Sequence, residues 1–120
     1  MLKLEEEAKK FMQFKNKSLI TANEYQEKCK ATAIYPKKDA IAYLSLGLVS
    51  EAGEVAGKIK KNIRDGSKSN VASEIGDVLL YCAMLANELD VNLGKLMEDN
   101  LYKLNDRKVR GTLQGSGDDR

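Results

Sequence analysis

Apolar residues recur three and four positions apart along most of this chain, which is the spacing of an amphipathic α-helix. The clearest run lies in the second half of the sequence and contains Val71, Ile75, Val78, Cys82, Leu85 and Leu89. No alternating run of β-branched residues interrupts the helical spacing. The sequence therefore predicts an all-α fold.

Capping and breaking residues divide the chain into helical segments. Thr21 and Glu24 have the spacing of a capping box, which predicts a helix that starts near Ala22. A long helix is expected from about Lys38. Breaks between helices are predicted at residues 34–36, 64–67 and 90–92. We expect a bundle of four main helices with an additional helix at the N-terminus.

The 120 residues are enough for one domain. We expect this domain at residues 21–110, with a helical extension at residues 1–20 and a flexible tail at residues 111–120. A domain of this size buries only about two-thirds of its unfolded surface, so its core is thin. Because the apolar faces of the third and fourth helices are long for one bundle, we expect a homo-dimer or homo-tetramer, with a monomer as the alternative.

Four acidic residues lie within two otherwise apolar helices. Glu51 and Glu54 are three residues apart, as are Glu74 and Asp77, so each pair shares one helix face. The two pairs are symmetric about residue 64, which falls in a predicted loop. If the two helices pack antiparallel, all four acids therefore lie at about the same level.

The surroundings of these acids are almost entirely Leu, Val, Ile, Ala and Gly, which predicts that they lie at or near the core. The alternative is that all four face solvent and form ordinary helix ion pairs. Against it, neither Glu51 nor Glu74 has a basic residue four positions on, because Val55 and Val78 stand there. Clustered carboxylates with little water around them either take up protons or bind a cation.

Oxygen ligands without histidine or cysteine select a hard metal ion. Mg²⁺ fits best, because it binds through a few carboxylates together with substrate phosphates, and Mn²⁺ is a substitute. Glycines within the same two helices each cost about 1 kcal/mol relative to alanine, which indicates close helix approach or room for a ligand. These glycines are Gly47, Gly53, Gly57 and Gly76.

Three further side chains extend the acidic faces. Lys58 and Lys61 continue the face of Glu51 at helical spacing and would suit a metal-bound polyphosphate, although a C-terminal helix cap is an equal alternative. Tyr81 lies one turn beyond Asp77 and could donate a hydrogen bond to a phosphate or a ligand carboxylate, or be a core residue.

Composition excludes several classes of protein. The chain has no histidine, which removes Ser-His and Cys-His nucleophile systems and most zinc sites. Its net charge of +2 does not indicate a general nucleic-acid binder, and no uncharged stretch is long enough to span a membrane. The acidic N-terminus lacks the pattern of a secretion signal, and Cys29 and Cys82 lack metal or redox spacing, so we expect a cytoplasmic protein.

The two acidic motifs, Glu51-Ala-Gly-Glu54 and Glu74-Ile-Gly-Asp77, resemble those of the MazG-like nucleotide pyrophosphohydrolases, within the all-α NTP pyrophosphatase superfamily. The resemblance implies a MazG-like helical catalytic domain that hydrolyses (deoxy)nucleoside triphosphates between the α and β phosphates to the monophosphate and pyrophosphate. It implies that all four acids bind Mg²⁺. One of the carboxylates, Glu54 or Glu74, would act as the general base.

The same resemblance assigns substrate contacts. Lys103 and Arg107, with Asn100, would contact phosphates, and Tyr35 stands where relatives use an aromatic ring against the base. The chain has no tryptophan, which some relatives use there. Two rival functions remain: a specialised enzyme directed at dUTP or dCTP, and a non-catalytic helical module that binds nucleotides or regulates a partner. Control of nucleotide pools and removal of damaged nucleotides both suit the enzyme.

Overall fold

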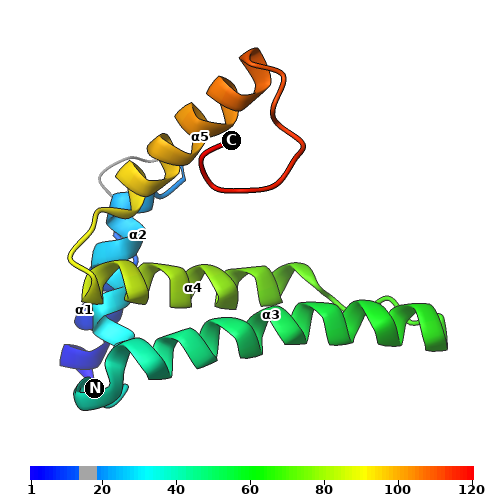
Figure 1. Cartoon of the computed structure of the whole chain (residues 1–120). Coiled ribbons are helices and arrows are strands. Elements are labelled where there is room, and N and C mark those ends of the chain that lie inside the picture. The colour runs from blue at the N-terminus through cyan, green and yellow to red at the C-terminus, as the bar shows by residue number, and fades with distance from the viewer. Residues whose placement is uncertain (14–18) are drawn as a thin grey trace.

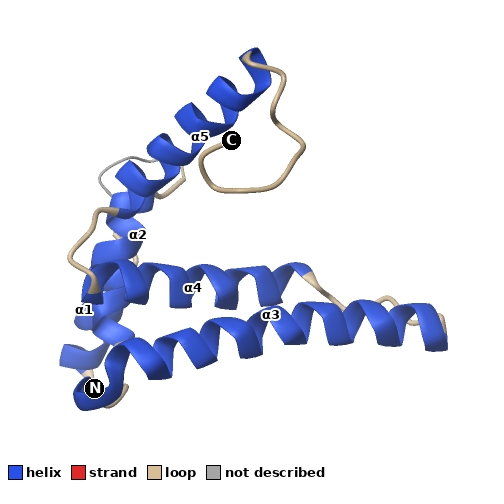
Figure 2. Ribbon diagram, in the orientation of Figure 1, coloured by secondary structure: helices blue, strands red, loops and turns tan. Residues whose placement is uncertain are grey.

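The computed structural model describes residues 1–13 and 19–120, and within these ranges all regular structure is helical (Figures 1 and 2). Its α-helices are α1 (Leu2–Phe11), α2 (Ala22–Cys29), α3 (Ala40–Asp65), α4 (Ala72–Glu88) and α5 (Leu93–Val109). Two short 3₁₀ turns, η1 (Lys30–Thr32) and η2 (Lys37–Asp39), lie between α2 and α3. The predicted all-α fold is confirmed.

The centre of the fold is an antiparallel hairpin formed by α3 and α4 (Figure 1). Gly66, with a φ of 66°, ends α3 in the left-handed conformation that glycine adopts without strain. The connecting loop is short, so the two helices lie side by side. This hairpin carries both acidic motifs and fixes their relative level.

Helix α2 crosses α4 and holds the turn between α4 and α5. It starts as predicted at Ala22, because the Thr21 side chain accepts a hydrogen bond of 3.1 Å from the backbone N–H of Glu24. The buried Gln26 side chain donates to the carbonyl of Val91 and accepts from the backbone N–H of Leu93, both at 2.7 Å. These bonds satisfy groups that the turn would otherwise leave without a partner.

Helix α5 packs against α2 and then extends away from the α3–α4 hairpin (Figure 1). Gly94 allows the close contact, because a Cβ there would lie 2.7 Å from Oδ1 of Asn23. A single chain therefore does not close the four-helix bundle that the periodicity predicts.

The core is small. Among the described residues, Leu44 is the one large side chain that is fully buried, and it packs with Tyr35, Ala40 and Met84. Many apolar side chains of α3, α4 and α5 remain exposed. They include Leu46, Val49, Ile63, Leu79, Leu101 and Tyr102. In the described ranges, no helix is both long and apolar enough to cross a bilayer.

The N-terminal helix α1 contacts α2, and the residues after α5 contact one another. Lys28 of α2 donates a 2.7 Å hydrogen bond to the carbonyl of Phe11 at the end of α1. After α5, the Arg120 side chain donates to the carbonyls of Thr112, Leu113 and Gly117, which turns residues 111–120 back on themselves. The flexibility expected of this tail stays a prediction.

Candidate metal centre

Three carboxylates from the α3–α4 hairpin converge on one point. Glu51 of α3 and Glu74 and Asp77 of α4 each offer one oxygen, and these oxygens all lie within 4.8 Å of one another. The common level inferred from the sequence therefore holds for these three residues. Because the ligands are all oxygens, the group fits a hard divalent cation such as Mg²⁺ or Mn²⁺.

Glu54 lies at the edge of this group. Its carboxylate is not among the three that converge, and the residue is exposed. It is nevertheless close enough to contribute to the electrostatic environment of Glu51. The metal-ligand role predicted for Glu54 stays a prediction.

The expectation that all four acids lie at or near the core does not hold for Glu54 and Asp77 in the single chain. Glu51 and Glu74 are only partly buried, and Asp77 is exposed like Glu54. The physical reason is that a large part of the apolar surface around them has no packing partner. A Cβ added at Gly53 or at Gly57, Gly66 and Gly76 would meet no atom within 4 Å.

The charges in the group act in opposite directions on two of its members. Loss of hydration raises the pKa of Glu51, and the negative charges of Asp77, Glu74 and Glu54 add to the rise. The pKa of Glu74 is instead lowered, chiefly because Lys58 donates a hydrogen bond to its carboxylate. The site is thus repulsive at Glu51 and compensated at Glu74.

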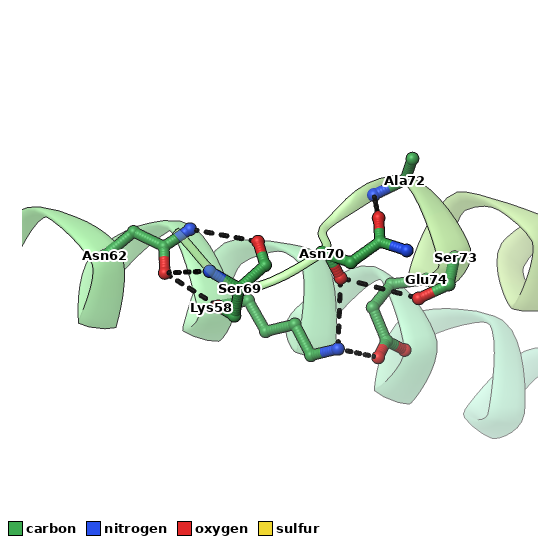
Figure 3. Close-up of polar contacts among 7 residues, drawn as sticks. All are labelled: Lys58, Asn62, Ser69, Asn70, Ala72, Ser73 and Glu74. Atoms are coloured by element: carbon green, nitrogen blue, oxygen red, sulfur yellow. Dashed lines mark hydrogen bonds and ion pairs between the residues drawn. The ribbon is translucent and has the colours of Figure 1, made fainter. Parts of the chain in front are cut away.

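Among the described residues, Lys58 is the basic residue that forms an ion pair with one of these acids (Figure 3). Its Nζ lies 2.6 Å from Oε1 of Glu74 and donates a second hydrogen bond of 3.2 Å to the carbonyl of Asn70. Lys61, one turn along, is exposed, and its charge acts on Asp65 at the end of α3. The structure therefore brings Lys58, but not Lys61, to the carboxylates of the candidate metal centre.

Tyr81 continues the α4 face beyond Asp77. Its ring lies directly over Gly47, where an added Cβ would overlap the ring carbons. Burial raises the pKa of its hydroxyl, and the nearby Tyr43, Glu51 and Asp77 raise it further. The close approach predicted for a helix glycine occurs at position 47.

Tyr35 lies in the core beside this aromatic ring. Its hydroxyl donates to Glu88, and Nζ of Lys37 lies 3.1 Å from both the Tyr35 hydroxyl and a Glu88 carboxylate oxygen. The rings of Tyr35 and Tyr43 stack with their centroids 6.3 Å apart. A small cavity of about 70 Å³ lies between them and Tyr81.

Sequence reasoning missed Tyr43 and the Lys37–Glu88 pair. Tyr43 had a usable signal, because it stands four residues before Gly47 and eight before Glu51, on the same helix face. Glu88 had none, because its partners lie more than fifty residues away in the chain.

The substrate-binding residues expected on α5 are not brought to the carboxylates within one chain. Asn100 and Lys103 are exposed on a helix that packs against α2. Arg107 is buried under the C-terminal residues, where Nη2 donates a 2.5 Å hydrogen bond to the carbonyl of Asp118. Its buried Nε has no hydrogen-bond partner among the described residues.

A helical hairpin with converging carboxylates defines the molecule as an all-α protein with a candidate divalent-metal centre. The model of the MazG nucleotide pyrophosphohydrolase domain matches residues 40–111, which span α3 to α5. The chain belongs to this family. It is also similar to the "Gene 37 protein" of Mycobacterium phage L5, with 44% identity over 109 residues, covering 80% of this chain and 96% of the phage protein. No solved structure matches the chain.

Proposed function

We propose that this protein is a Mg²⁺-dependent nucleoside triphosphate pyrophosphohydrolase, which cleaves the bond between the α and β phosphates and releases the monophosphate and pyrophosphate. The observation that carries the proposal is the convergence of Glu51, Glu74 and Asp77 within a segment that belongs to a nucleotide pyrophosphohydrolase family. Triphosphate hydrolysis needs compensation of the charge on phosphate oxygens, and this carboxylate group is suited to hold the ion that supplies it.

The carboxylates divide into two roles in this proposal. Glu51, Glu74 and Asp77 hold the divalent ion, with Mn²⁺ as a substitute for Mg²⁺. When bound, the ion neutralises charge on the triphosphate oxygens. In this proposal Glu54 would join the ligands, and either Glu54 or Glu74 would accept the proton from the attacking water.

In this proposal, aromatic and basic residues around the metal centre contact the substrate. Tyr35 would meet the base and Tyr81 a phosphate, and both line a small cavity together with Tyr43. Lys58 and Lys61 would meet the phosphates from α3. Asn100 and Lys103 would do so from α5, as would Arg107 after the C-terminal residues that bury it move away. Since α5 of the same chain extends away from the hairpin, we propose that a second copy supplies them.

The size of the exposed surface supports a homo-dimer or homo-tetramer. The chain exposes 9523 Å², whereas a compact monomer of 13.3 kDa exposes only about 6,500 Å². The excess is roughly 3,000 Å² per chain, or about 6,000 Å² for two chains, which is at the upper end of the total area that obligate oligomers bury. A second copy that covers the apolar faces of α3, α4 and α5 would complete both the bundle and the site.

A pyrophosphate-release assay over canonical and modified nucleoside triphosphates, with and without Mg²⁺, tests the proposal. We expect Mg²⁺-dependent release that Asp77→Asn abolishes while the circular dichroism spectrum keeps its helical form. A strong preference for dUTP or dCTP would identify a specialised enzyme. Binding of a non-hydrolysable triphosphate without turnover of any nucleotide would contradict the proposal and support a binding module.

We also propose that the protein is located in the cytoplasm, where the reducing environment suits its two free cysteines.

A further inference from the structure

Lys58 binds a carboxylate that a metal ion in the candidate centre would also bind. Its Nζ lies 2.6 Å from Oε1 of Glu74, and the two side chains are only 31% and 15% exposed. Glu74 is also one of the three residues whose oxygens converge at the candidate metal centre. One carboxylate therefore serves both the ammonium group and the metal centre.

The loop between α3 and α4 keeps Lys58 in this position (Figure 3). Oδ1 of Asn62 accepts hydrogen bonds from the hydroxyls of Ser67 and Ser69, at 2.9 and 2.7 Å, and from the backbone N–H of Ser69 at 3.2 Å. The loop fixed in this way presents the Asn70 carbonyl, which accepts the second Lys58 hydrogen bond at 3.2 Å. The ammonium group is thus directed at Glu74 by its backbone partner as well as by charge.

The charges of the centre explain why such a partner is needed. Three carboxylates with oxygens within 4.8 Å of one another repel when no cation lies between them. The ammonium group compensates one of them, at the price of a positive charge that opposes the approach of a divalent ion. A metal that takes Glu74 as a ligand has to compete with Lys58 for the same carboxylate.

We propose that Lys58 is a built-in counter-ion, a positioning residue that holds Glu74 while the centre lacks metal and that a divalent cation displaces. This inference rests on the proposed function only for the binding of metal at this centre. Displacement leaves the ammonium group one helical turn from Glu54 and free to contact a phosphate. Metal binding and exposure of a phosphate contact are then one event.

The test measures Mn²⁺ binding to the metal-free full chain by electron paramagnetic resonance, without nucleotide. Lys58→Met should bind Mn²⁺ at least fivefold more tightly than the wild type, because both the competitor and its charge are gone. Lys58→Arg, which keeps the charge, should bind like the wild type. Lys60→Met is the matched control, since Lys60 is exposed on the same helix and lies outside the centre.

Thermal unfolding gives a second measurement that does not depend on activity. Without metal, Lys58→Met should unfold at a lower temperature than the wild type, and Mn²⁺ should raise its Tm by more than that of the wild type. If all variants bind Mn²⁺ equally, the metal centre stands and the role of Lys58 is wrong. If Lys58→Met binds more weakly, Lys58 supports the metal, and the inference is also overturned. If no variant binds Mn²⁺, the proposed metal centre fails together with it.

Discussion

At the scale of single residues, two glycines of α3 differ in their surroundings. A Cβ at position 47 would overlap the Tyr81 ring, whereas one at position 53 would meet nothing within 4 Å. The first position therefore depends on glycine for packing within the chain, and the second does not.

We expect Gly47→Ala to destabilise the protein by about 1–3 kcal/mol, because the Tyr81 ring has to leave its place. Pyrophosphate release should fall as well, since the ring lies beside Glu51 and Asp77. Gly53→Ala should instead be neutral or stabilise by up to about 1 kcal/mol, as alanine favours the helix. Urea unfolding measures both variants, and an equal loss at the two positions would refute the assigned packing.

A second prediction concerns Glu51. Its raised pKa means that the folded state favours the protonated form, so its negative charge destabilises the metal-free protein at neutral pH. Glu51→Gln should therefore raise Tm without metal at pH 7, and the wild type should approach the variant as the pH falls through the raised pKa. Added Mn²⁺ should stabilise the wild type but not the variant. Differential scanning fluorimetry checks both effects, and a lower metal-free Tm in the variant would contradict them.

The residues of the centre differ in how far the sequence could identify them. Helical spacing and the symmetry about the loop are visible in the sequence, and they place Glu51, Glu74 and Asp77 on one level. The ion pair of Lys58 with Glu74 is not visible there, since it depends on the backbone carbonyl of Asn70 and thus on the conformation of the loop. Helical periodicity gives the face of a residue, and it contains nothing about loop carbonyls.

At the scale of the elements, hydrogen bonds join the segment before α3 to the end of α4. Tyr35 and Lys37 both contact Glu88, and the hydrogen bond from Tyr35 is the main reason why the pKa of Glu88 is lowered. A lowered carboxyl pKa contributes stability above the unfolded-state value, and this contribution is lost as the pH falls through the folded-state value.

Glu88→Gln should therefore lower Tm at pH 7, and the difference from the wild type should vanish in acid, below the folded-state pKa. Glu98→Gln is the control, because Glu98 is exposed on α5 and outside this contact. Thermal unfolding from neutral to acidic pH measures both variants. A difference that persists unchanged in acid would show that the Glu88 charge has no part in joining the two segments.

Helix boundaries followed from the sequence where a local signal exists. The capping box at Thr21 lies at the start of α2, and the left-handed Gly66 lies at the end of α3. The direction of α5 did not follow, because it depends on how Gln26 of α2 binds the turn before α5. Such a contact between segments more than sixty residues apart has no periodic pattern.

At the scale of the whole molecule, the chain is extended. Its radius of gyration is 17.9 Å, against about 14 Å for a compact domain of this length. Together with the exposed apolar faces, this supports assembly of the bundle from more than one chain. The sequence predicted helices with long apolar faces, but periodicity does not distinguish a partner helix in the same chain from one in a second copy.

A mixing experiment tests whether two copies share each site. Asp77→Asn removes a carboxylate of the hairpin, and Lys103→Gln removes a cation of α5, so each variant alone should be inactive or nearly so. If the two residues act in one site from different chains, mixing the variants should restore up to about a quarter of wild-type activity in random dimers. No recovery after confirmed subunit exchange would mean that α5 does not act across chains.

The thin core also links folding to the amount of protein present. With Leu44 as the one large side chain fully enclosed among the described residues, little of the folding free energy is available to an isolated chain. If association supplies the remaining folding free energy, each chain folds stably only after it binds another. The concentration of folded protein then rises more steeply than the concentration of chains. Scarce expression would then leave almost no hydrolysis, and modest induction would switch it on.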